Sequence, residues 1–462
     1  MSLMKRILLF SFFAIAGALF TDFSAHAQSG EGISLRYSLN ASYYLVERSN
    51  WSKYENGKYV GLTHRETRAN VSAVPGGSDN LRFSGFFYVL EETLRDMSRA
   101  SRGIDETREA AFTVSPEGKM LFQKDPGFPA LREFPVYPQG PVYPGDRWQA
   151  EGKRVIDPRN DGNRTILPIM VEYEFVGPEA WNGRSVHRLR AKFATRLSKY
   201  LKTKSDDPAL KDATGTHDVD ILVDAETGAA CLILDRLDET FIYEGGSTIR
   251  FRGNTAIFTE APVPIDGATL IPKIAGISDL SADGDRSSQS TRNARSALPP
   301  TDDTFAESSG TAAQGTRAPA TGIAPAPQAS APPSSDGGNK PFSVEETSQG
   351  IRLSVRDIRF AADSDAILGE EAWRLDAIAE ALKLVPGGRF LVEGHTASVG
   401  KPEGEKRLSV ARAQRIVEQL TKRGLQAEQF IYAGYGGTKP VADNATGAGR
   451  AQNRRVEITI LE

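Results

Sequence analysis

The chain has 462 residues, of which 39% are apolar and 25% are charged, a composition typical of globular proteins with two or three domains. Its formal net charge of −3 gives no general attraction to nucleic acid or to an anionic membrane surface. A single cysteine, Cys231, excludes an intrachain disulfide and a cysteine-based metal cluster.

Residues 1–27 have the features of a secretory signal peptide. Lys5 and Arg6 precede an apolar run over residues 7–20, and Ala25-His26-Ala27 provides a small-x-small cleavage site. An uncleaved anchor is the alternative, but the apolar run is short for a bilayer span. We therefore expect an exported protein that has no transmembrane span after cleavage.

Residues 28–270 are predicted to form a soluble β-rich domain. Short runs alternate apolar and polar residues, which indicates antiparallel sheet with one buried face; they cover residues 33–46, 81–90, 169–177, 218–228 and 247–258. Asn182-Gly183 and residues 226–228 are typical of hairpin turns. Charges at outward positions such as Glu172 and Arg250 favour a water-soluble domain over one embedded in a membrane.

Two segments of this domain depart from the alternation. The proline-rich residues 125–148 are expected to cross the end of the sheet or to line an edge, because proline cannot donate to a strand ladder. Residues 198–214 are expected to form a charged surface loop.

The polar residues of this domain show no catalytic pattern. His64, His187 and His217 lack ligand-like spacing, so we expect hydrogen-bonded histidines at the surface or at strand edges. We expect the acidic cluster of Asp235, Asp238 and Glu239 to be solvated. No nucleophile elbow, zinc motif or phosphate-binding loop is present. The sequence therefore predicts a protein that is not an enzyme, with no cofactor and no metal site.

Residues 271–341 are predicted to be a disordered linker. They are rich in Pro, Ala and Ser and contain few large apolar residues, so they cannot offset the entropy of ordering their backbone. A random coil of this length spans about 45 Å. Such a tether would hold the two flanking domains some distance apart.

Residues 342–462 alternate between strand and helix patterns. Strands are predicted over residues 351–360, 389–394, 429–436 and 454–461, and amphipathic helices over residues 370–384 and 409–423. This order predicts a βαβαβ mixed sheet with its helices on one side. The expected fold class is therefore α+β multidomain.

Five motifs in this last domain occur in order: FAADSDAIL from Phe360, GHT from Gly394, LSVARA from Leu408, GYGGTKPVADN from Gly434 and GRAQNRRVEI from Gly449. Together they resemble the OmpA C-terminal-like family, which holds peptidoglycan stem peptides in the periplasm. In that family an aspartate after HT and the arginine of LSxxRA clamp the amino and carboxylate groups of diaminopimelate. The resemblance places Arg412 at the arginine position. A cation near the start of its predicted helix would oppose the helix dipole, so a bound anion would explain it better.

The chain departs from the family at Ala397, fifteen positions before Arg412, where the aspartate is expected. Losing a charge-assisted hydrogen bond costs about 1.5–3 kcal/mol. Three interpretations follow: Asp363 supplies the anion, the pocket takes a different stem peptide as in spirochaete OmpA-like proteins, or the fold has become a protein-binding module.

The resemblance also suggests supporting residues. Thr396 and Ser398 would donate hydrogen bonds to the peptide, and His395 would fix the loop by hydrogen bonding. Asn453 and Arg454 would either border the ligand groove or brace the sheet.

The predicted function is a non-enzymatic protein of the cell envelope, periplasmic and peripheral to the outer membrane, that tethers its β-domain to peptidoglycan. One alternative is an interaction scaffold that no longer binds diaminopimelate. Another makes the N-terminal sheet a carrier of lipid or another apolar ligand, which requires a deep apolar cavity within residues 28–270.

Overall fold

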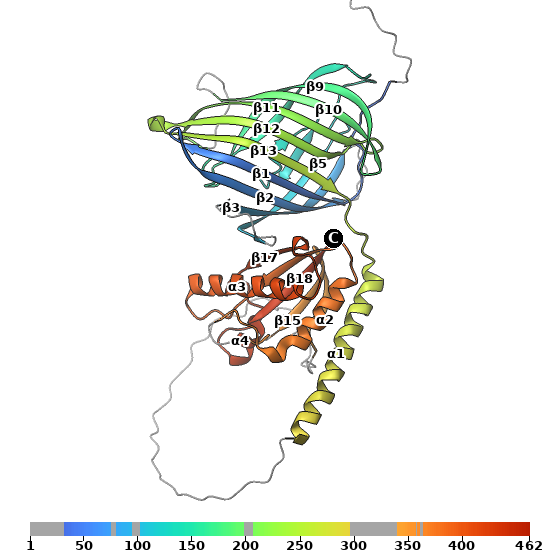
Figure 1. Ribbon diagram of the computed structural model, residues 1–462, viewed down its shortest axis with the longest axis vertical. Helices are drawn as coiled ribbons and strands as arrows, with labels where there is room; N and C mark the ends of the chain where they lie inside the picture. The colour runs from blue at the N-terminus through green and yellow to red at the C-terminus, as the bar shows by residue number, and fades with distance from the viewer. Residues whose placement is uncertain are drawn as a thin grey trace, which may run out of the picture.

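The computed structural model describes residues 32–74, 80–94, 102–197, 207–295, 340–356, 358–360 and 364–462. A large curved sheet forms the N-terminal domain, and a smaller sheet covered by helices forms the C-terminal domain (Figure 1). The predicted signal peptide lies outside the described residues.

Within the described ranges, the N-terminal sheet has twelve antiparallel strands in the order β6-β5-β3-β2-β1-β13-β12-β11-β10-β9-β8-β7. Their bounds are β1 Tyr43–Glu55, β2 Lys58–Val74, β3 Leu81–Leu94, β5 Glu106–Val114, β6 Met120–Lys124, β7 Leu131–Arg132, β8 Arg147–Ile156, β9 Thr165–Trp181, β10 Arg184–Leu197, β11 Leu210–Asp224, β12 Ala230–Tyr243 and β13 Thr248–Glu260. A 3-10 turn, η1 (Glu244–Gly246), connects β12 to β13.

The predicted alternation is confirmed along most of these strands. In β9, every second residue from Thr165 to Phe175 is buried, as expected for a sheet with one face in the core. Asn182 and Gly183 have positive φ angles of 48° and 77° and form the predicted hairpin turn. The strand predicted over residues 33–46 starts later than expected, because β1 begins only at Tyr43. Ile33 instead makes an isolated bridge to Val142.

The proline-rich segment, residues 125–148, borders the sheet and also contributes side chains to its core. Its strand β7 is an edge strand, as predicted. Phe128 and Tyr137 nevertheless join the main apolar core, and the Tyr137 hydroxyl donates to the carbonyl of Gly228 at 2.5 Å. The predicted surface loop is shorter than expected, since β11 already begins at Leu210; residues 198–206 lie outside the described residues.

The prediction of a disordered linker is wrong for its first part. Helix α1 (Gly267–Arg295) begins before it, and Leu270 and Ile274 are buried in the core of the C-terminal domain. The Ser278 hydroxyl also donates to the carbonyl of Phe342 at 2.8 Å. Averaging the composition over seventy residues hid this short apolar stripe. The remainder, residues 296–339, lies outside the described residues.

The C-terminal sheet is mixed, with the order β14-β15-β18-β16-β17-β4. Its elements are β14 Ser343–Thr347, β15 Gly350–Arg356, η2 Gly369–Glu371, α2 Ala372–Lys383, β16 Arg389–Gly394, α3 Pro402–Thr421, η3 Ala427–Gln429, β17 Phe430–Gly434, α4 Gly447–Asn453 and β18 Arg455–Leu461. Strands β16 and β17 run parallel, whereas β18 is antiparallel to β15 and β16. Helices α2 and α3 bury the predicted apolar positions against one face, among them Ile378, Leu382 and Ile416.

The two domains contact each other directly. A cluster of buried apolar side chains joins Tyr88 and Leu90 of β3 to Leu391, Ile431 and Leu461 of the C-terminal sheet. The short strand β4 (Arg102–Gly103) belongs to the N-terminal part of the chain yet pairs in parallel with β17. The expectation that the linker holds the domains apart is therefore wrong for this structure.

No helix in the described part of the chain is long and apolar enough to cross a membrane.

Candidate functional site

The motifs of the C-terminal domain converge where β16 and β17 end. The loop after β16, residues 395–401, lies beside the loop after β17, residues 435–446, and helix α3 follows the first loop. This is the strand-end position at which α/β arrangements commonly bind ligands.

Hydrogen bonds hold the backbone of residues 395–401 in place. The His395 amide donates to the carbonyl of Arg455 at 3.0 Å, and the Thr396 amide donates to the carbonyl of Gly436 at 2.9 Å. The Glu405 carboxylate accepts from the amides of Val399 and Lys401 at 2.7 and 3.1 Å, and these bonds lower its pKa. The loop is thus preorganised.

Three buried side-chain atoms in this loop find no hydrogen-bond partner among the described residues: His395 Nδ1, His395 Nε2 and Thr396 Oγ1. His395 is 3% exposed and Thr396 is 7% exposed. Burial, followed by the Arg455 guanidinium, lowers the pKa of His395 to about 3, so its ring is neutral. The ring stacks on Tyr435 with centroids 5.6 Å apart. The loop is thus held by the His395 backbone, and the prediction that the side chain does so by hydrogen bonding is wrong.

Arg412 lies on helix α3, which follows the loop of residues 395–401. Its guanidinium carbon sits 4.6 Å from the centroid of the Phe360 ring, and its Nε donates to the carbonyl of Ser364 at 3.4 Å. Helix α3 begins at Pro402, so Arg412 is in the middle of the helix. The predicted conflict with the helix dipole therefore disappears, because the dipole acts only in the terminal turns.

Asn453 and Asn444 brace the loop after β17. Asn453 is fully buried, accepts from the Val441 amide at 2.8 Å, and donates to the Asn444 side chain at 2.9 Å. Asn444 also accepts from the Ser398 amide at 3.1 Å, which brings Ser398 and Asn453 together. Asn453 thus holds the loop after β17, while Arg454 is exposed.

Ala397 is buried, at 7% exposure. A methyl group therefore occupies the interior position where the family resemblance leads one to expect a carboxylate. Asp363, the predicted substitute, lies outside the described residues, while the nearby Asp365 pairs with Arg415 at 2.8 Å.

Two residues with clear roles here were missed by sequence reasoning. Glu405 could have been found as an acidic residue in the first turn of α3. Asn444 had no such signal, since its contacts with Ser398 and Asn453 depend on how the two loops meet.

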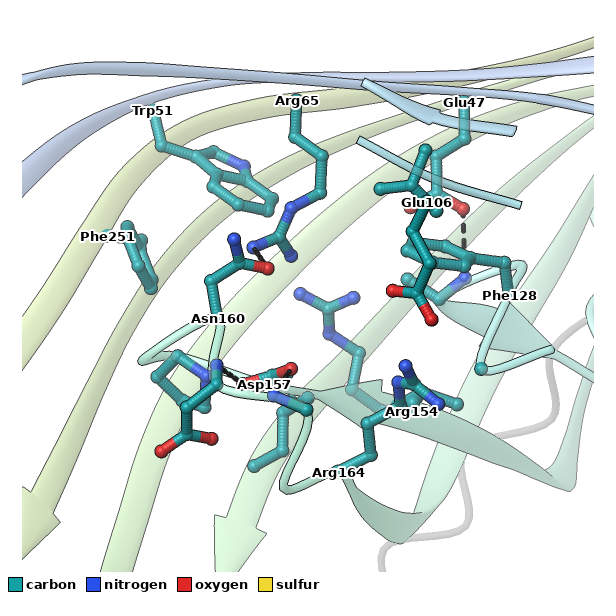
Figure 2. Close-up of a pocket in the computed structure, with 18 of the residues that line it drawn as sticks. Glu47, Trp51, Arg65, Glu106, Phe128, Arg154, Asp157, Asn160, Arg164 and Phe251 are labelled. Carbon is teal, nitrogen blue, oxygen red and sulfur yellow. Dashed lines mark hydrogen bonds between the residues drawn. The ribbon is translucent and has the colours of Figure 1, made fainter. Parts of the chain in front are cut away.

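The N-terminal domain contains a cavity of about 740 Å³ (Figure 2). Its lining includes Arg65, Arg154 and Glu106, together with the aromatic rings of Trp51 and Phe251. Because charged groups of both signs line this cavity, it is not the deep apolar cavity that a lipid carrier would need.

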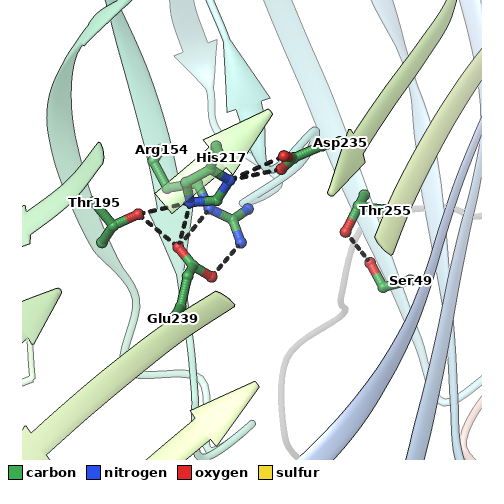
Figure 3. Close-up of polar contacts among 7 residues, drawn as sticks. All are labelled: Ser49, Arg154, Thr195, His217, Asp235, Glu239 and Thr255. Carbon is green, nitrogen blue, oxygen red and sulfur yellow. Dashed lines mark hydrogen bonds and ion pairs between the residues drawn. The ribbon is translucent and has the colours of Figure 1, made fainter. Parts of the chain in front are cut away.

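Beside the cavity, His217 is buried between two carboxylates (Figure 3). Its Nδ1 lies 2.9 Å from Asp235 and its Nε2 lies 3.0 Å from Glu239, which also pairs with Arg154 at 2.9 Å. Burial opposes charge on the ring, but the hydrogen bonds to Asp235 and Glu239 outweigh it and raise the pKa of His217. The predictions of a surface histidine at His217 and of solvated acids at Asp235 and Glu239 are wrong, because all three side chains are buried in the interior enclosed by the curved sheet.

Comparison with known proteins places the C-terminal domain. The model of the OmpA family matches residues 359–454. Outer membrane porin F of Pseudomonas fluorescens is 36% identical over 112 residues, which are 24% of this chain and 34% of that protein. Peptidoglycan-binding protein ArfA of Mycobacterium tuberculosis is 34% identical over 103 residues, 22% of this chain and 32% of that protein.

The chain thus spans about a third of the length of these two relatives. It covers much more of the outer-membrane lipoprotein YfiB of Pseudomonas aeruginosa, which is 34% identical over 120 residues, 24% of this chain and 71% of that protein. Through this C-terminal domain, the chain belongs to the OmpA family.

Proposed function

We propose that the OmpA family domain binds peptidoglycan non-covalently and thereby attaches the N-terminal domain to the cell wall, in the periplasm and without catalysis. The observation that carries the proposal is the fixed loop at residues 395–398, where His395 and Thr396 bury polar atoms that lack hydrogen-bond partners among the described residues. Such atoms cost about 1–3 kcal/mol each unless a ligand or solvent satisfies them. The relative ArfA is itself named a peptidoglycan-binding protein.

In this proposal, Arg412 binds a carboxylate of the stem peptide. A planar guanidinium can donate two parallel hydrogen bonds to a carboxylate, and the Phe360 ring against it restricts its orientation. The Thr396 and Ser398 hydroxyls would donate to peptide oxygens. Asn453 would act by holding the adjacent loop, and Arg454 would border the groove.

Ala397 gives the site an asymmetric charge. The cation proposed to bind the carboxylate is present, but a buried methyl replaces the expected anion for the ligand's amino group. We infer that binding is weaker than with an aspartate, or directed to a stem peptide whose third residue lacks that amino group. Compensation by Asp363 is the alternative within this function.

Co-sedimentation of the chain from Gln28 to Glu462 with purified sacculi tests the proposal. The wild-type chain should sediment, and Arg412→Gln should weaken binding by about 10- to 100-fold, the worth of a charge-assisted hydrogen bond. Arg407→Gln is the matched control, since Arg407 is an exposed arginine of the same helix; it should bind like the wild type.

Two results would contradict the proposal. If the wild-type chain stays in the supernatant, the domain does not bind the wall and an interaction scaffold becomes the better account. If both arginine variants sediment like the wild type, the wall is bound at a different surface.

A further inference from the structure

The cavity of the N-terminal domain lies inside the curved sheet. Strands β1, β2, β3, β5, β8, β12 and β13 supply its walls, and residues of the loop 157–164 also line it. Its volume of about 740 Å³ lies within the range of about 300–1,000 Å³ that is usual for small-molecule sites.

Two buried donors on residues of the cavity lining, Trp51 Nε1 and Arg108 Nε, have no hydrogen-bond partner among the described residues. The indole Nε1 of Trp51 is buried and has no hydrogen-bond partner among the described residues, and Trp51 as a whole is 7% exposed. Figure 2 shows the Trp51 ring beside Arg65 and Asn160, and the Arg65 guanidinium carbon is 5.6 Å from the ring centroid. The Arg65 guanidinium also donates to Asn160 at 3.1 Å. An unsatisfied buried N–H is costly, so its position indicates a ligand with an acceptor oxygen.

Several carboxylates of the lining already have donors within the protein. Glu47 accepts from the Ala130 amide at 2.9 Å, Glu239 pairs with Arg154 at 2.9 Å, and Asp157 accepts from the Gly162 amide at 3.0 Å. These groups hold their positions before any ligand enters, as expected of a preorganised site. They still have acceptor capacity, because a carboxylate can accept about four hydrogen bonds.

The lining selects among ligand classes. A lipid chain would leave the arginines and carboxylates buried without water, which is costly. A strongly charged ligand would meet like charges, since both signs line the cavity. A hydroxyl group both donates and accepts, so a ligand rich in hydroxyls suits a wall that holds both arginines and carboxylates. The rings of Trp51, Phe128 and Phe251 provide apolar surface for the C–H faces of such a ligand.

We propose that this cavity binds a neutral saccharide, with Trp51 Nε1 and Arg65 donating to its oxygens. The proposal is independent of wall attachment through Arg412, because the two sites lie in different domains. It gives the N-terminal domain a recognition role of its own.

The test is a glycan array of peptide-free neutral hexose and N-acetylhexosamine oligosaccharides, probed with the full chain and followed by titration calorimetry of the best binder. Trp51→Phe keeps an aromatic ring and removes the N–H, so it should weaken saccharide binding by about tenfold. Arg65→Met should also weaken it. Trp148→Phe is the matched control, because the Trp148 N–H already donates to the Val136 carbonyl at 2.9 Å and lies outside the lining.

Arg412→Gln should leave saccharide binding unchanged, which separates this test from that of wall attachment. Three results would overturn the proposal: no saccharide of the array binds, binding is equal in the wild type and in both cavity variants, or inorganic phosphate or citrate binds the cavity where no saccharide does. Thermal melting of each variant confirms that it is folded before its result is counted.

Discussion

Each of the two domains buries a histidine, and the pKa values of these two histidines are shifted in opposite directions. His217 of the N-terminal sheet lies between Asp235 and Glu239, which raise its pKa, and its two ring nitrogens each face a carboxylate. His395 of the C-terminal loop has its pKa lowered to about 3. Neither of its ring nitrogens has a hydrogen-bond partner among the described residues, and Nε2 lies 4.0 Å from the Glu457 carboxylate.

The difference is one of hydrogen bonding: the ring nitrogens of His217 both have partners within the protein, whereas those of His395 have none among the described residues. The network around His217 supplies its own counter-charges, so it stabilises the wall of the cavity without any ligand. Beside His395, polar atoms remain available in a loop whose backbone is fixed. Buried polar groups therefore mark a site where their hydrogen bonds are incomplete, as at Thr396 and Trp51.

The largest expected effect breaks the complete network. Glu239→Gln leaves the buried Arg154 without its anion, and loss of one partner of a buried pair costs about 3–5 kcal/mol. The free energy of unfolding in urea measures this loss. Asp238→Asn is the control, since Asp238 is the adjacent residue and pairs with Arg250 at the surface; it should cost less than about 1 kcal/mol. Equal losses in both variants would show that the buried network is not special.

A second prediction concerns the contact between the domains. Ile431→Ala removes a buried side chain from the cluster with Tyr88 and Leu90, at a cost of about 2–5 kcal/mol. Calorimetry should then show the two domains melting in more clearly separated transitions. Val399→Ala, at a position that is 66% exposed, should leave the thermogram unchanged. If the thermogram of Ile431→Ala is the same as that of the wild type, the domains are not docked through this cluster.

The third prediction uses pH to compare the two histidines. The folded state holds the His217 proton more tightly than an unfolded chain, whose histidine pKa is about 6.5. The contribution of His217 is therefore full below about pH 6.5 and is lost as pH rises through its folded pKa. The sign is reversed for His395, whose contribution is lost as pH falls from about 6.5 towards its folded pKa of about 3.

Urea unfolding of His217→Gln and His395→Gln across this pH range checks both signs, and NMR titration of the five histidines identifies each ring. The substitution at His217 should cost most in acid, and the substitution at His395 should benefit the chain there relative to the wild type. The same pH trend in both variants would refute the comparison.

Local patterns predicted the elements well, and contacts between distant segments were missed. The periodicity of residues 370–384 and the five motifs located α2 and the loop that holds Thr396. The partners of His217 come from strands β10 and β12, and Arg154 of β8 joins them through Glu239. No local spacing could reveal that these side chains share one interior. The pairing of β4 with β17 joins residues more than three hundred positions apart, so it too lacks a local signal.

The most direct test of the central claim is the affinity of the full chain for a soluble stem peptide containing diaminopimelate, measured by calorimetry. Ala397→Asp should tighten binding by about 10- to 100-fold, because it restores an anion worth about 1.5–3 kcal/mol. Arg412→Gln should weaken binding in both the wild-type and the Ala397→Asp background. If Ala397→Asp folds but gains no affinity, and Arg412→Gln loses none, the loop and Arg412 do not form a peptide-binding site.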